Sequence, residues 1–148
     1  MEKKITTPRE RFVRLTRPEL KRVFDECNEK YFCNKLTCPD LFDLWTPSKN
    51  IAGWIRAYWI PKKRKWGTAI HISNRFKWTK ENLRDTMVHE MIHLEIGDYR
   101  KRISWWKRLL NKDHDKDFRK RMEELNSSYG LRVMVIAKHM RAYRITPK

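Results

Sequence analysis

The chain has 148 residues, of which 40% are hydrophobic and 12% aromatic. This composition suits one packed domain; it excludes a disordered chain, and the length excludes two domains of ordinary size. Its 35 Lys and Arg against 18 Asp and Glu give a net charge of +17, which is typical of proteins that bind polyanions.

The first half of the chain predicts a helix followed by strands. Pro18 and Glu19 suit the first turn of a helix over residues 18–32. Its apolar residues recur at helical spacing: Leu20, Val23, Phe24, Cys27 and Tyr31. Aromatic and β-branched residues then predict three strands, at residues 41–45, 51–60 and 68–73. We expect these to form a small antiparallel meander.

The second half predicts two more helices. Thr79 is a suitable N-cap and Gly97 a suitable left-handed C-cap for a long helix between them. A basic, Trp-containing segment spans residues 99–110. A further helix over residues 113–125 carries Phe118, Met122 and Leu125 on one face, while the tail from 131 to 145 fits strand and helix equally well.

The long helix contains the pentapeptide His89-Glu90-Met91-Ile92-His93. Residues four apart lie on one helix face, so both imidazoles can reach one Zn²⁺. Glu90 can reach a zinc-activated water, take its proton and pass it to a leaving amine. The motif therefore predicts a zinc metallopeptidase with His89 and His93 as ligands and Glu90 as general base.

A catalytic zinc site needs a third protein ligand and an open fourth position. We favour His114, because it shares a predicted inward helix face with Phe118. Asp98, just past the end of the long helix, is the acidic alternative. Glu95 lies about 200° around the helix from His93 and is expected to point away.

Two other histidines are expected to be structural or solvent-exposed. His71 lies on a predicted strand, facing away from its two Ile neighbours, and His139 lies in the tail. No oxyanion donor can be assigned; the candidates are Tyr143, Arg141 and His139. We expect an extended peptide substrate to pair with the sheet edge, at the strand over residues 68–73.

The pentapeptide, the segment His114-Asp115-Lys116-Asp117-Phe118 and the strand 69–74 resemble the SprT-like family, which includes the Spartan proteases. The resemblance covers residues 18–125. It implies a zincin-like α+β fold in one domain over residues 1–148, with zinc on His89, His93 and His114 and with Glu90 as base. It also implies, from Spartan-like members, DNA-stimulated proteolysis of proteins crosslinked to DNA.

The chain departs from the family pattern in two places. Asp115 stands where the family usually has Gly. The C-terminal zinc ribbon common in bacterial relatives is missing, since no Cys follows Cys38, and residues 131–148 form a basic extension instead. We therefore expect any DNA binding to depend on the basic domain itself.

The predicted DNA surface joins cations to aromatic residues, as single-strand binders do. Its cations are Lys62, Lys63, Arg64, Lys65, Arg100, Lys101, Arg102, Lys107 and Arg108. The alternative is a solvated cationic face, with Trp105 and Trp106 in the core.

A rival interpretation is a non-catalytic, zinc-stabilised nucleic-acid-binding or structural protein in which Glu90 is idle. The enzyme is favoured, because a structural zinc site normally closes its fourth position with Cys or His, and no such ligand lies nearby. Hydrolysis of a non-peptide substrate is a third interpretation.

Compartment and partners are predicted from absences in the sequence. The three cysteines, Cys27, Cys33 and Cys38, are an odd number that suits free thiols in the cytoplasm. The N-terminus lacks the apolar run of a signal peptide, which predicts a protein that is not secreted. No run approaches the roughly 18 apolar residues of a membrane span. We expect a monomer.

Overall fold

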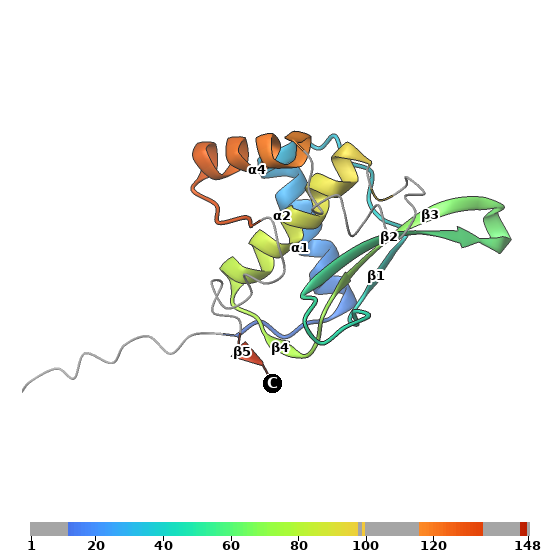
Figure 1. Cartoon of the computed structure of the whole chain (residues 1–148). Helices are drawn as coiled ribbons and strands as arrows, with labels where there is room; N and C mark the ends of the chain where they lie inside the picture. Colours follow the sequence, from blue (N-terminus) through green and yellow to red (C-terminus); the bar gives the residue numbers. More distant parts are fainter. Residues whose placement is uncertain (1–11, 98, 100–115, 135–145, 148) are drawn as a thin grey trace, which may run out of the picture.

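The structure is a computed structural model that describes residues 12–97, 99, 116–134 and 146–147. It has an α+β fold in which the helices lie beside a small mixed sheet (Figure 1). The elements are α1 (Arg17–Phe32), β1 (Leu41–Asp43), β2 (Gly53–Ile60), the 3-10 turn η1 (Pro61–Lys63), β3 (Lys65–Ile72), β4 (Phe76–Lys77), α2 (Lys80–Ile96), α4 (Lys116–Tyr129) and β5 (Thr146–Pro147).

The predicted helices over residues 18–32 and between Thr79 and Gly97 are confirmed, and so are both predicted caps of the second one, whereas the cap of the first was not predicted. Thr16 caps α1 by accepting the Glu19 N–H at 3.2 Å. Thr79 caps α2 in the same way through the Asn82 N–H at 3.1 Å. Gly97 ends α2 in the left-handed region, with φ of 77° and its N–H bonded to the His93 carbonyl. These are local signals, and they hold because helix ends need partners for exposed backbone groups.

The predicted antiparallel meander is wrong. The strand order is β1-β3-β2, with β1 parallel and β2 antiparallel to β3. Residues 44–52 straddle the end of β3, since the Leu44 carbonyl accepts the Asn74 N–H and the Ala52 carbonyl accepts the Ser73 N–H. This connection carries the chain from one side of β3 to the other, so β1 and β2 are not neighbours.

The helix α4 is confirmed, with a different end. It extends past the predicted Leu125 to Tyr129, because Gly130, at φ of 66°, is the residue that stops it. Phe118 and Leu125 are buried, as the predicted inward face requires. The predicted start at residue 113 lies outside the described residues.

The core lies where α1 and α2 meet the sheet. Phe24 of α1 packs edge-on against Phe42 of β1, with ring centroids 5.7 Å apart. Trp78 is 1% exposed, and its indole N–H donates to the Ser73 carbonyl at 2.8 Å. The fully buried members include Leu20, Phe24, Phe32, Ile70, Ile72, Leu83, Met87, Met91 and Ile92. No helix in the described part of the chain is long and apolar enough to cross a membrane.

The β2–β3 hairpin extends well beyond the helices (Figure 1). The strand β1 pairs with β3 only from Ala69 to His71, whereas β2 pairs with β3 along its whole length. Residues 57–68 therefore form a two-stranded projection, which we call the hairpin arm. Its turn, with η1, contains Lys62, Lys63 and Arg64, three cations of the predicted DNA surface.

Candidate metal and catalytic site

The two histidines of the pentapeptide lie together on one face of α2. Their ring centroids are 5.1 Å apart. Two imidazoles that bind one tetrahedral zinc at ~2.0–2.1 Å would have their ring centroids about 5.2 Å apart. The spacing of His89 and His93 therefore fits a shared zinc ion.

Phe118 of α4 packs against both rings. Its ring centroid lies 4.9 Å from that of His89 and 4.6 Å from that of His93, and its side chain is fully buried. An aromatic ring in this place restricts the rotamers of both histidines. The two imidazoles are thus held in position by a neighbouring helix as well as by their own.

A backbone carbonyl fixes the tautomer of His89. The Nδ1 atom of His89 lies 2.6 Å from the carbonyl oxygen of Met134. Because a carbonyl can only accept, Nδ1 carries the proton, and the neutral ring has its lone pair on Nε2. Zinc-binding histidines are commonly oriented in this way, through a hydrogen bond from the nitrogen that faces away from the metal. The donor chemistry of His89 therefore fits zinc.

The segment that supplies this carbonyl, residues 131–134, is held from both sides. Asn126 of α4 donates to the Val133 carbonyl at 3.0 Å and accepts the Val133 N–H at 2.9 Å. On the α2 side, the Arg132 N–H donates to Asp85, one helical turn before His89. We call the pair of Asn126 hydrogen bonds the Asn126 clamp. The clamp holds the segment that ends at Met134, and so it positions the Met134 carbonyl that contacts His89.

Asp85 is buried, and this changes its acidity. Its side chain is 2% exposed and accepts a hydrogen bond from Arg84 Nε at 3.1 Å. Burial raises the pKa of the Asp85 carboxyl above its ordinary value, against the opposing effects of Arg84 and the Arg132 N–H. Its contacts give Asp85 a structural task, which is to hold the 131–134 segment against α2.

Glu90 is buried at the junction of α2 and the first residue of β2. It is 4% exposed. A Cβ atom added to Gly53 would lie 2.9 Å from Glu90 Oε1 and 2.9 Å from Thr86 Cγ2. Gly53 thus provides the space that the Glu90 carboxylate occupies. Sequence reasoning missed this residue, although a glycine at a strand end often marks a close approach.

Glu95 pairs with a cation of α4. Its carboxylate accepts a hydrogen bond from Arg121 Nε of α4 at 2.8 Å. Tyr99, the one described residue just beyond Gly97, shares a hydrogen bond of 3.0 Å with the Thr68 hydroxyl. The end of α2 is therefore tied to both α4 and β3.

The predicted third ligands lie outside the described residues. These are His114 and its alternative Asp98, and the oxyanion candidates His139, Arg141 and Tyr143 lie outside them as well. Within residues 12–97, 99, 116–134 and 146–147, no three His, Cys, Asp or Glu side chains gather at one point. The three cysteines are free thiols.

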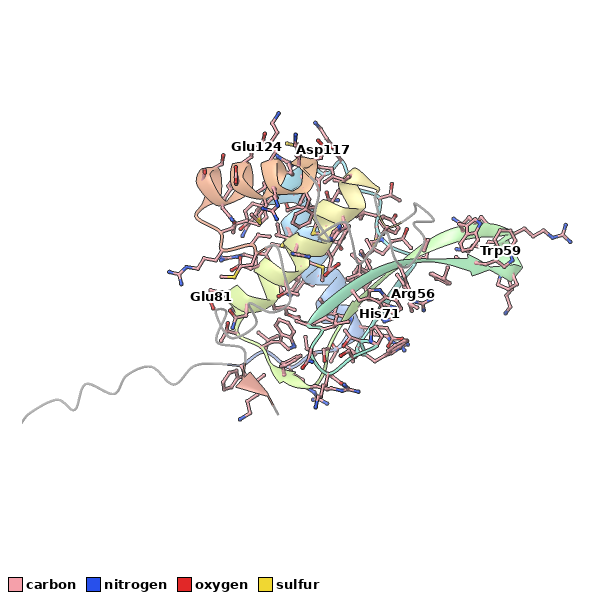
Figure 2. The ribbon with its side chains drawn as sticks, in the orientation of Figure 1. Arg56, Trp59, His71, Glu81, Asp117 and Glu124 are labelled. Carbon is pink, nitrogen blue, oxygen red and sulfur yellow. The ribbon has the colours of Figure 1, made fainter. Side chains whose placement is uncertain are left out.

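His71 has a structural environment on the opposite face of the sheet. It is fully buried, and its Nε2 accepts a hydrogen bond from Arg56 Nε at 3.0 Å (Figure 2). The rings of Trp45 and Trp54 each lie 5.0 Å from the imidazole. Burial, with a smaller contribution from Arg56, lowers the pKa of His71 below its ordinary value. The prediction of a structural histidine fits these contacts.

The expected substrate edge is wrong, because β3 is the central strand. Both of its sides are occupied, by β1 and by β2. Among the described strands, β2 is the edge that begins beside Glu90. Of the predicted basic surface, Lys62, Lys63, Arg64 and Lys65 are exposed at the turn of the hairpin arm, and the remaining cations lie outside the described residues.

Comparison with protein families identifies a relationship. The model of the SprT-like family matches residues 20–139, from α1 to beyond α4. The chain belongs to the SprT-like family. This family is associated with metallopeptidase-like proteins and with zinc, and the resemblance seen in the sequence is confirmed. A comparison with curated proteins found no match.

Proposed function

We propose that the chain is a zinc-dependent peptidase that hydrolyses peptide bonds of protein substrates. The observation that carries this proposal is the hydrogen bond between His89 Nδ1 and the Met134 carbonyl, since it orients Nε2 for a metal. The spacing of the two imidazole rings and membership of the SprT-like family support it.

In this proposal His89, His93 and His114 hold the metal. His114 precedes Phe118 by four residues, the interval of about one helical turn, and Phe118 contacts both other histidines. Asp98 is the competing third ligand. Zinc bound there supplies a Lewis acid that polarises the scissile carbonyl and acidifies water.

Glu90 is the proposed general base. Its burial beside Gly53 keeps the carboxylate in one place and excludes bulk solvent. It takes a proton from the attacking water and delivers it to the leaving amine. The substrate backbone would pair with the exposed edge of β2, which begins next to this carboxylate.

We also propose that the substrates are DNA-associated or DNA-crosslinked proteins. The net charge of +17 and the exposed cations of the arm turn, Lys62, Lys63 and Arg64, support a polyanionic partner. Replacing these three residues with Ser should lower the affinity for single-stranded DNA and flatten its dependence on salt. No association of the native chain with DNA at low salt would refute this part.

The alternative is a non-catalytic zinc-stabilised nucleic-acid-binding or structural protein. Gly53 favours the enzyme, because a structural zinc site does not require a carboxylate accommodated beside its ligands. If this alternative is correct, the protein catalyses no reaction that replacing Glu90 could abolish.

The test compares wild type, Glu90→Gln and Glu95→Gln. All three should bind one zinc ion, measured by mass spectrometry of the metal content. Wild type and Glu95→Gln should cleave a basic protein substrate, with and without single-stranded DNA, while Glu90→Gln should not. Glu95→Gln is the matched control, because Glu95 lies on the same helix but pairs with Arg121. Undiminished cleavage by Glu90→Gln would refute the mechanism.

Variants His114→Ala and Asp98→Ala distinguish the two candidate third ligands by their zinc content.

A further inference from the structure

Two tryptophans of the hairpin arm are exposed to solvent. Trp59 is 48% exposed and Trp66 is 61% exposed. They are a cross-strand pair, with ring centroids 5.8 Å apart at an interplanar angle of 68°. Figure 2 shows Trp59 near the outer end of the arm, away from the helices. Adjacent exposed aromatic side chains are typical of a binding surface.

The pair lies on the same face of the sheet as Glu90. Successive side chains of a strand point to opposite faces, so Gly53, Ile55 and Trp59 share one face of β2. Gly53 on this face adjoins Glu90, and Ile55 is buried in the core. Trp59 therefore lies on the same face of β2 that the helices cover at Gly53 and Ile55, closer to the body of the protein.

The distance along the strand defines a register. Trp59 is six residues from Gly53, which corresponds to about 20 Å in an extended strand. A peptide paired antiparallel with the edge of β2 would run from Trp59 toward Gly53 and Glu90. Its residue beside Trp59 would lie about six positions on the N-terminal side of the bond beside Glu90.

We infer that Trp59 and Trp66 form a remote substrate subsite for a large apolar side chain, about six residues on the N-terminal side of the cleaved bond. The inference rests on the proposed peptidase function. It specifies the substrate as an unfolded or extended protein segment, because a folded chain cannot pair along the whole of β2. The arm supplies this subsite outside the catalytic centre, so it selects which segments reach Glu90.

The geometry favours a peptide side chain over a nucleobase. The two rings meet edge to face, which forms an apolar corner rather than two parallel faces for stacked bases. Trp59 also lies on β2, the edge strand that starts at Gly53 beside Glu90.

The first experiment measures binding without cleavage. Fluorescently labelled β-casein, an unfolded protein, is titrated with Glu90→Gln protein. Adding Trp59→Ala or Trp66→Ala should weaken binding about tenfold, as expected for an aromatic residue central to an interface. Trp45→Ala is the matched control, since Trp45 is 47% exposed but contacts His71 on the other face. Equal affinity for all four proteins would overturn the inference.

The second experiment maps cleavage sites in β-casein by mass spectrometry. Wild type and Trp45→Ala should favour sites with a large apolar residue about six positions N-terminal to the cut, and Trp59→Ala should lose this preference. Cleavage with the same profile in Trp59→Ala overturns the subsite while leaving the peptidase standing. A loss of oligothymidine affinity in Trp59→Ala, without a change in casein binding, would assign the pair to nucleobases and overturn the inference. Casein binding that depends on Trp59 without any cleavage would contradict the peptidase function and retain the docking surface.

Discussion

Adding one methyl group at Gly53 tests whether the Glu90 carboxylate must occupy its observed position. In Gly53→Ala the new Cβ would lie 2.9 Å from Glu90 Oε1, whereas ordinary contacts of a Cβ atom begin at 3.4 Å. Glu90 must therefore move by about half an ångström, because Thr86 Cγ2, also at 2.9 Å, blocks the other direction. Catalytic groups tolerate displacements of only ~0.5 Å, and a shift of about 1 Å can cost roughly 10²-fold in rate.

We expect kcat/KM of Gly53→Ala to fall at least about tenfold, which corresponds to about 1.4 kcal/mol of transition-state stabilisation. The crowding should also destabilise the fold by about 1–3 kcal/mol. The assay measures kcat/KM on zinc-saturated protein below its Tm, together with zinc content, which should stay at one ion per chain.

Gly67→Ala is the matched control for this prediction. Its Cβ would lie 2.5 Å from Ile60 Cδ1 and 2.9 Å from Asp40 Oδ2, so it also crowds the sheet, but at the arm. It should lower Tm, and it should lower kcat/KM of the folded protein less than Gly53→Ala does, because it does not crowd Glu90. The reasoning is refuted if Gly53→Ala keeps full activity, or if Gly67→Ala loses as much activity as Gly53→Ala.

Three further predictions concern the clamp, the outer face of the sheet and the thiols. Asn126→Ala should lower zinc affinity about 10–100-fold in a chelator competition, because the clamp holds the carbonyl that orients His89. Asn28→Ala is the control, because Asn28 makes a similar pair of hydrogen bonds with the backbone of Leu36. It should lower the free energy of unfolding without lowering zinc affinity. An equal loss of zinc affinity in Asn126→Ala and Asn28→Ala would contradict the role of the clamp. Because burial lowers the pKa of His71, the folded state binds fewer protons than the unfolded chain between the two pKa values. The free energy of unfolding should therefore fall as pH drops from above about 6.5 toward the folded-state pKa, and urea titrations of His71→Gln should show a weaker fall than wild type. Burial raises the pKa of Cys27 to about 12, so a thiol reagent should modify two cysteines rapidly and Cys27 only on unfolding; three rapid reactions would contradict its burial.

The parts of the fold that sequence predicts are those fixed by neighbouring residues. The N-caps Thr16 and Thr79 act within three residues of their partners, and only the second was named in advance. The position of His89 and His93 on one helix face follows from their spacing alone. The sheet order does not, because residues 44–52 are long enough either to turn back or to pass the end of β3. Which of these two paths the chain takes is determined only by the hydrogen bonds between this connection and residues at the end of β3, which are distant in sequence.

The supporting residues of the site could not be predicted for the same reason. Gly53 meets Glu90, and Met134 meets His89, across 37 and 45 positions of sequence respectively. The residue type predicts neither role, since glycine has no side chain and Met134 contributes only its backbone carbonyl. Asn126 could have been noticed as a polar residue close to a helix end, where amides often bind backbone groups.

Anomalous X-ray scattering at the zinc edge, from crystals grown with one equivalent of zinc, tests the proposed site most directly. We predict one peak within about 2.0–2.1 Å of Nε2 of both His89 and His93. Zinc bound elsewhere, such as at the exposed thiols of Cys33 and Cys38, with none between the two imidazoles, would contradict the proposal.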